Sequence, residues 1–201
     1  DWQDIDRFSQ LLTSRGILPY FSYGYCPYPT REAGGDFRSQ PNNLDTWKEI
    51  TRSIASHFKE NGVRIGYHEV WNEPDCNTTF YTGTWEEYCK LYAYGATGIR
   101  EGDPDAVVGG PSTAWVNSPG TRYGDFLSYV EENNLPLDFF SMHRYGTDYL
   151  LKIDSVRQEL EKAGARFETV PIHVNEINTD TAPWNYGEIC VRYEMAADIF
   201  S

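Results

Sequence analysis

Short apolar runs alternate with longer amphipathic stretches along the chain, and this alternation constrains the fold more than any other feature. Short runs bounded by glycine, proline or asparagine are typical of buried strands. The predicted strands span residues 17–23, 65–71, 106–109, 138–142 and 171–175. Strands separated by helices pair in parallel through right-handed crossovers. The sequence therefore predicts an α/β protein with a parallel sheet.

The stretches between these strands predict helices, because their apolar residues recur at steps of three and four. Residues 44–61 form the clearest case, with one apolar stripe from Trp47 to Phe58. Thr84 and Glu87 have the spacing of a capping box at the start of another helix. The predicted helices span residues 5–14, 44–61, 84–101, 123–133, 148–163 and 188–200. One helix thus precedes the first strand and another follows the last.

A parallel sheet of this kind is either an open doubly wound sheet or a closed (β/α)8 TIM barrel. No glycine-rich phosphate turn follows the first predicted strand, which argues against the nucleotide-binding doubly wound fold. Polar and aromatic residues cluster just after the strands, where a barrel places its active site. The 201 residues are fewer than the roughly 250 of a complete barrel. We therefore expect one domain, residues 1–201, that covers a partial (β/α)-barrel and leaves two sheet edges unpaired.

The charge balance limits the classes of partner. The chain has 17 basic and 30 acidic residues and a net charge of −13. Such a surface repels phosphate backbones and anionic lipids, so neither nucleic acid nor a membrane is expected as partner. No apolar run approaches the roughly 20 residues that span a bilayer. The 15% aromatic content favours a carbohydrate substrate, because sugar rings stack their C–H faces on aromatic rings, and the oligomeric state stays open.

The cysteines and the first residues bear on location. No signal-peptide pattern follows Asp1, and the sequence reads as though it begins within a longer one. The cysteines Cys26, Cys76, Cys89 and Cys190 lack the paired spacing of a zinc site. We expect mainly free thiols, with Cys26 and Cys76 as the pair if a disulfide forms. The sequence leaves the location open and slightly favours a secreted or extracellular protein.

The most specific motif is the run 69–74, Glu-Val-Trp-Asn-Glu-Pro, at the end of the second predicted strand. Pro74 cannot donate to a strand ladder, so the strand ends there and leaves Glu73 at the rim. Glycoside hydrolysis needs a carboxylic acid that protonates the departing oxygen, and Glu73 is the candidate. Asn72 beside it can bind a sugar hydroxyl. Since alternation sends these two side chains to opposite faces, the backbone must bulge or turn if both reach the sugar.

The alternative for Glu73 is a structural role, as a buried glutamate in a polar layer of the barrel. We expect that structural role for Glu69.

A second carboxylate, Glu176, follows the fifth predicted strand, three βα steps after Glu73. Side chains three strands apart in a closed barrel can face each other across its mouth. A retaining glycosidase holds its two carboxyl groups about 5–5.5 Å apart, and an inverting one about 6.5–9.5 Å apart. Glu176 is therefore the candidate nucleophile, and the separation from Glu73 decides between the two mechanisms.

These motifs resemble a known group of enzymes. Trp-Asn-Glu-Pro at a strand end and a glutamate three strands later resemble clan A glycoside hydrolases, whose acid/base and nucleophile follow barrel strands 4 and 7. Residues 69–74, 108–111 and 138–145 are similar to family 39, the β-xylosidase and α-L-iduronidase family, and the similarity covers nearly the whole chain. The resemblance implies that barrel strands 3 to 7 are present, and strands 1, 2 and 8 absent. It also implies a retaining, β-xylosidase-like hydrolase.

The resemblance assigns roles to single residues. It implies Glu73 as acid/base, Glu176 as nucleophile and Asn72 as a ligand of the sugar. It further implies that His143 and Tyr145 touch substrate or nucleophile. The chain departs from the family pattern on either side of the nucleophile, where an asparagine replaces a small hydroxyl residue and an isoleucine replaces an aromatic one.

Strand alternation gives His143 the same parity as Phe139, Ser141 and Tyr145, so all four are expected to face the barrel interior. A structural histidine is the alternative for His143. The histidines of the chain lack ligand spacing, so no metal or other cofactor is expected.

Tryptophans fall into two groups. Trp115 and Trp184 lie in loops after strands and are candidates for stacking on sugar. Trp47 lies on the apolar stripe of a helix and is expected in the core.

Two other functions compete with the retaining hydrolase. A barrel section without strands 1, 2 and 8 could bind carbohydrate and be catalytically incomplete. An endo-acting glucanase of the same clan would keep the mechanism and change the substrate. Hydrolysis by a Ser/His/Asp triad finds no nucleophile elbow in this sequence.

Overall fold

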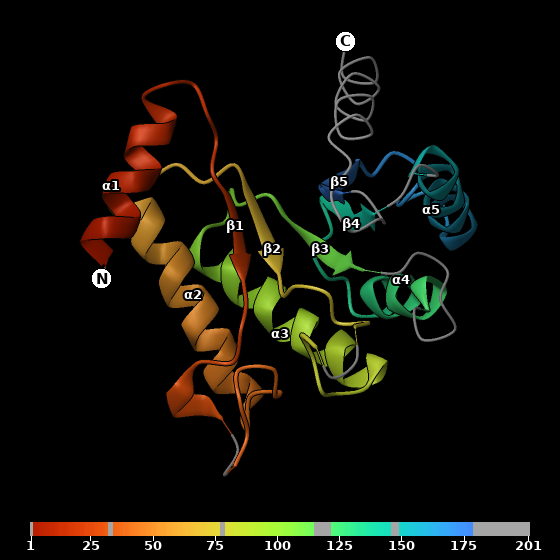
Figure 1. Ribbon diagram of the computed structural model, residues 1–201, viewed down its shortest axis with the longest axis horizontal. Helices are drawn as coiled ribbons and strands as arrows, with labels where there is room; N and C mark the ends of the chain where they lie inside the picture. Colours follow the sequence, from red (N-terminus) through yellow and green to blue (C-terminus); the bar gives the residue numbers. More distant parts are fainter. Residues whose placement is uncertain (1, 32–33, 77–78, 115–121, 146–148, 179–201) are drawn as a thin grey trace.

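The computed structural model describes residues 2–31, 34–76, 79–114, 122–145 and 149–178. Its sheet has five parallel strands in the order β1-β2-β3-β4-β5, so each strand pairs with its neighbours in sequence. The strands are β1 Tyr20–Tyr23, β2 Tyr67–Val70, β3 Val108–Thr113, β4 Phe139–Tyr145 and β5 Ile172–Asn178. The sheet curves from β1 to β5, and helices surround it on one side (Figure 1). The fold is a half-barrel of the TIM type.

The helices are α1 Trp2–Thr13, α2 Leu44–Glu60, α3 Trp85–Gly102, α4 Tyr123–Glu132 and α5 Tyr149–Ala163. The bounds of α2 to α5 agree with the sequence to within one residue. The expected capping box of Thr84 and Glu87 is present at the start of α3, and Asn43 caps α2 by accepting from the backbone of Asp45 and Thr46. A 3-10 helix, η1, spans Tyr28–Thr30. The helix predicted at 188–200 lies outside the described residues.

The strand ends differ from the prediction. β1 and β2 are shorter than expected, whereas β3, β4 and β5 run three or four residues further at their C-terminal ends. These extra residues include polar ones that interrupt the apolar pattern. Three of them, Ser112, His143 and Glu176, can be polar because they meet at the rim on the inner side of the half-barrel.

Helices α2 and α3 pack closely because glycines of α3 lie against α2. A Cβ atom at Gly98 would lie 2.3 Å from the carbonyl oxygen of Lys48 and 2.3 Å from Oγ1 of Thr51. Trp47, 2% exposed, fills the adjoining space, and its indole N–H donates to the carbonyl oxygen of Leu91. Trp47 is thus a core residue, as its place on the helix stripe predicts.

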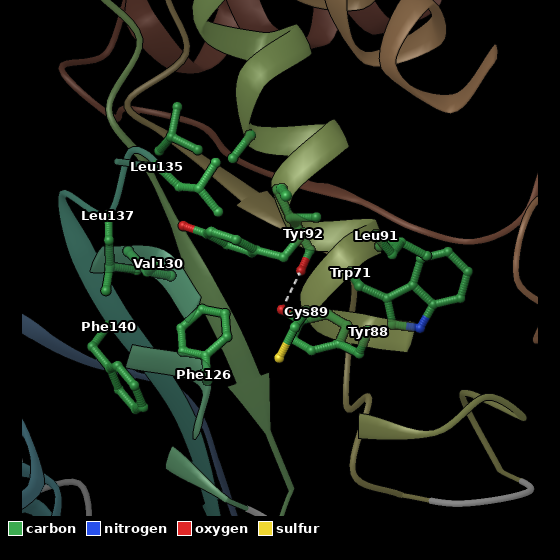
Figure 2. Packing of buried hydrophobic residues seen from close by; sticks show 14 of the residues in the cluster. Trp71, Tyr88, Cys89, Leu91, Tyr92, Phe126, Val130, Leu135, Leu137 and Phe140 are labelled. Atoms are coloured by element: carbon green, nitrogen blue, oxygen red, sulfur yellow. Dashed lines mark hydrogen bonds between the residues drawn. The ribbon is translucent and has the colours of Figure 1, made fainter. Parts of the chain in front are cut away.

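The core between α3, α4 and the sheet is rich in aromatic residues (Figure 2). Tyr88 and Tyr92 are fully buried, and each hydroxyl has an acceptor. Tyr92 donates to the carbonyl oxygen of Pro136 at 2.7 Å, and Tyr88 to that of Val70 at 3.1 Å. Buried hydroxyls need such partners. Because Val70 is the last residue of β2, the core also fixes the end of this strand.

Side chains on the concave face of the sheet form layers, as in a barrel. The layer nearest the N-terminal ends of the strands is aromatic. In it, the ring of Phe139 on β4 stacks on that of His173 on β5, with ring centres 4.6 Å apart. Tyr20 on β1 reaches across to Phe139, with ring centres 5.6 Å apart. Phe139, Ser141 and His143 follow the expected parity and face this interior.

The outer strands of the described sheet are β1 and β5, so its two edges lie where a partial barrel leaves them. Beside β1, an apolar groove lies between this strand and α1, lined by Ile5, Phe8, Leu12 and Phe21 among others. Phe8 of α1 is 61% exposed. The apolar stripe that predicts this helix therefore has little to pack against within the described residues.

Cys26, Cys76 and Cys89 are free thiols, so the alternative disulfide between Cys26 and Cys76 is not formed. Cys190 lies outside the described residues. Among the helices that the structure describes, none combines the length and the apolar character needed to cross a bilayer.

The close contact of α2 and α3 predicts the effect of adding one methyl group. Gly98→Ala should lower the free energy of unfolding by about 1–3 kcal/mol, because overpacking forces the two helices apart. Urea denaturation followed by circular dichroism measures the change. Gly124→Ala in α4 is the matched control: its Cβ would meet nothing within 4 Å. That variant should gain up to about 1 kcal/mol of helix propensity. Equal stability of the two variants would contradict the packing argument.

Candidate active site

The backbone turns sharply where β2 ends. Trp71 and Glu73 have positive φ angles of 72° and 47°, which are rare for residues with a side chain. Neighbouring strands hold this turn on both sides: the amide of Trp71 donates to the carbonyl oxygen of Tyr23, and the amide of Glu73 to that of Ser112. The turn ends the strict alternation of faces. It lets the neighbouring Asn72 and Glu73 both meet residues of the rim.

Glu73 lies in a buried contact with His143. The residue is 8% exposed, and its Oε1 lies 2.7 Å from Nδ1 of His143, which is 3% exposed. The other ring nitrogen, Nε2, lies 2.9 Å from Oγ of Ser112. Both nitrogens of the imidazole are therefore engaged, and its orientation is fixed. Asn72 donates from Nδ2 to the hydroxyl oxygen of Tyr25 at 3.0 Å.

A bulge in β5 turns Glu176 toward the same place. Met142 pairs with Val174 and His143 pairs with Glu176, so Asn175 is an extra residue without a partner on β4. Alternation would send Asn175 and Glu176 to opposite faces. The bulge brings both to the interior, where Oε2 of Glu176 lies 3.5 Å from Nδ1 of His143.

Tyr145 holds the other oxygen of the same carboxylate. Its hydroxyl donates a short hydrogen bond to Oε1 of Glu176. This bond, followed by burial and the charges of Glu176 and Glu73, raises the pKa of Tyr145 to about 12. The phenol therefore stays protonated and remains a donor at neutral pH.

The two carboxylates converge. One oxygen of Glu73, one oxygen of Glu176 and a ring nitrogen of His143 all lie within 4.8 Å of one another. The two carboxylates are thus close enough to act on one sugar ring from strands three steps apart in the sheet.

The imidazole of His143 is placed between these two acids and interacts with both. Burial lowers the pKa of His143, but the hydrogen bond with Glu73 and the charges of Glu176, Glu73 and Glu69 outweigh it. The pKa of His143 is therefore raised above its ordinary value. His68, on the helix-facing side of β2, shows the opposite case: burial lowers its pKa to about 4.

The donor types and the spacing of a small metal site are also present at Glu73, His143 and Glu176. A cation bound there would have to displace one of the hydrogen bonds that His143 makes with Glu73 and Ser112. The same arrangement can act without an ion as an acid, a nucleophile and a donor that orients both.

One rim of the half-barrel thus holds five of the residues predicted from the sequence: Asn72, Glu73, His143, Tyr145 and Glu176. Trp115 and Trp184 lie outside the described residues. Ser112, which contacts His143, was not predicted, because the Gly-Pro before it was read as the end of the strand. The positive φ of 55° at Ser112 has no signature in the sequence.

The chain is similar to known proteins over most of its length. The sequence pattern of the family Glycosyl hydrolases family 39 matches residues 1–192. A beta-xylosidase of Caldicellulosiruptor saccharolyticus is 28% identical over 207 residues, which cover 90% of this chain and 41% of the relative. A beta-xylosidase of Geobacillus stearothermophilus is 27% identical, with the same coverage. The crystal structure of a beta-xylosidase from Caulobacter crescentus superposes with a TM-score of 0.76 at 28% identity, over 91% of this chain and 42% of that one.

The chain therefore spans about two fifths of the length of these relatives.

The charge arrangement at His143 predicts its titration. Nuclear magnetic resonance of the ring should place its pKa above about 6.5, the ordinary value for histidine, whereas His68 should titrate near 4. Because the pKa of His143 is raised on folding, its contribution to stability is full below about 6.5 and is lost as the pH rises through the folded value. Glu73→Gln should lower the pKa of His143. A titration of His143 below 6 in the wild type would contradict the proposed pairing.

Proposed function

Because the chain belongs to glycosyl hydrolases family 39, we propose that it carries the catalytic acids of a retaining glycoside hydrolase. Glu73 would be the general acid/base and Glu176 the nucleophile. The observation that carries this proposal is the convergence of the two carboxylates, with oxygens within 4.8 Å, from strands three steps apart in the sheet.

The first step of the proposed reaction forms a covalent intermediate. Oε2 of Glu176 attacks the anomeric carbon, while the bond to the leaving oxygen breaks and that oxygen takes the proton of Glu73. The contacts support this division of roles. Tyr145 holds Oε1 of Glu176, which leaves Oε2 as the attacking oxygen. Glu73 is 8% exposed, and Nδ1 of His143, 2.7 Å from its Oε1, can share the proton that passes to the leaving oxygen.

In the second step, water attacks the anomeric carbon, gives its proton to Glu73 and releases Glu176. Two inversions at the same carbon retain its configuration. His143 contacts both acids and so can balance their charge as the negative charge passes from Glu176 to Glu73 in the first step and back to Glu176 in the second.

A β-xyloside is the proposed substrate, since the curated relatives at 27–28% identity are beta-xylosidases. Asn72 lies beside Glu73 and is a candidate ligand of a sugar hydroxyl, and Trp184 remains a candidate for stacking on the sugar. Carbohydrate is thus the proposed partner, with no cofactor.

One observation favours a second candidate, a barrel section that binds carbohydrate without cleaving it. The outer strands β1 and β5 and the exposed apolar side of α1 have no partner within the described residues. A site of this kind would bind xylose or xylobiose with no release of product.

Substitution of the two acids tests the proposal. Glu73→Gln should lower the rate with a poor leaving group by about 10²–10⁴-fold. With an activated aryl xyloside it should lower kcat/KM far less, because kcat/KM reports the first step and that leaving group needs no proton. Glu176→Gln should abolish turnover of both substrates. Release of nitrophenol measures the activated substrate and release of xylose the poor one, and Glu132→Gln, an exposed carboxyl on α4, is the control. Wild-type rates in both acid variants would exclude the proposed roles.

The separation of the acids predicts the stereochemistry. Proton magnetic resonance of the first product of a β-xyloside should show β-xylose, which then mutarotates. α-Xylose as the first product would show an inverting mechanism and would remove Glu176 as nucleophile.

A further inference from the structure

A further carboxylate, this one almost fully buried, lies in the layer beneath the two proposed acids. Glu69 of β2 is 2% exposed and contacts neither Glu73 nor Glu176 through a hydrogen bond that the structure describes. The proposed chemistry does not use it. A buried carboxylate is costly unless hydrogen bonds compensate it. Oε1 of Glu69 accepts from the hydroxyl of Tyr20 at 3.1 Å and from Nδ2 of Asn175 at 2.9 Å.

The bond between Glu69 and Asn175 spans the half-barrel. Glu69 belongs to β2 and Asn175 to β5, and these strands are separated in the sheet by β3 and β4. It therefore joins two strands that share no backbone hydrogen bonds. The acceptor is held firmly, because β2 has a strand on each side.

Asn175 is the residue that makes the bulge in β5. It has no partner in the register with β4, and the next residue is the proposed nucleophile. The described backbone pairing of this bulge is with β4, and Asn175 takes no part in it. The side chain of Asn175 supplies a second constraint, directed inward to a fixed acceptor.

We propose that Glu69 is a positioning residue, which holds Glu176 in its attacking position through Asn175. The inference rests on the proposed function, because it assigns Glu176 a reaction for which position matters. A displacement of about 1 Å at a reacting group can cost about 100-fold in rate. Loss of either partner should therefore lower the rate of nucleophilic attack and leave the fold intact.

A double-mutant cycle on an activated aryl β-xyloside tests this inference. Asn175→Ala and Glu69→Leu should each lower kcat/KM by about 10–100-fold. The double variant should lose no more than the worse single variant, because both changes remove the same bond. Glu69→Gln keeps an acceptor oxygen and should lose less than Glu69→Leu. Asn133→Ala is the control, since this asparagine also makes a side-chain hydrogen bond, to the carbonyl oxygen of Tyr129 at 2.8 Å, far from the site.

A comparison of activated and poor leaving groups distinguishes a loss of nucleophile positioning from a loss of acid catalysis. Asn175→Ala should lower kcat/KM with activated and poor leaving groups alike, because it disturbs the attack by Glu176 and not the protonation of the leaving oxygen. Losses of Asn175→Ala and Glu69→Leu that multiply in the double variant would overturn the inference, as would wild-type kcat/KM in Asn175→Ala.

A measurement without turnover keeps this test apart from that of the proposed function. Crystal structures of the wild type and Asn175→Ala should show Oε2 of Glu176 moving from its 3.5 Å separation from Nδ1 of His143. The expected displacement is about 1 Å. An unmoved carboxylate would overturn the role of Asn175 even in an active enzyme. If the wild type cleaves no glycoside but the carboxylate still moves in Asn175→Ala, the positioning contact would be supported and the hydrolase rejected.

Discussion

Two carboxylates can lie close together in a shielded site only if something offsets their mutual repulsion, and in this protein the imidazole of His143 does so. It contacts Glu73 at 2.7 Å and Glu176 at 3.5 Å through the same nitrogen. Like charges at such distances otherwise force one group to take up a proton. Ser112 holds the opposite nitrogen, so the ring cannot rotate away. The strand ends around it are arranged so that the two acids reach this one ring.

Regular strands could not have produced that arrangement, since alternation would turn one residue of each neighbouring pair outward. At the end of β2 the backbone is left-handed at Trp71 and Glu73, which interrupts the alternation. In β5 a bulge at Asn175 interrupts it. Left-handed residues with side chains cost about 1–3 kcal/mol each and persist where their surroundings hold them. Here the surroundings are the carbonyl groups of adjacent strands and the hydroxyl of Tyr88, which binds the last residue of β2.

Much of the fold could be read from the sequence, because its signals are local. The amphipathic stripe of α2 and the capping box of α3 lie within the helices that they define. The candidate acids were also visible, since Pro74 marks where β2 has ended. The rest depends on contacts between distant residues. Nothing near Asn175 reveals a bulge, because the partner that fixes it is Glu69, 106 residues away. Ser112 was missed for the same reason: its partner His143 lies on the next strand.

Different interactions hold Glu73 and Glu176 in place. Glu73 follows a strand that has a neighbour on each side and the aromatic core behind it, whereas Glu176 sits on β5, the margin of the described sheet. Side chains hold the carboxylate of Glu176, through the hydroxyl of Tyr145 and the imidazole of His143. Backbone hydrogen bonds to Tyr23 and Ser112 hold the turn at Glu73 instead. Substitutions of single side chains can therefore shift Glu176 while Glu73 keeps its place, so evolution could retune one carboxylate without rebuilding the other.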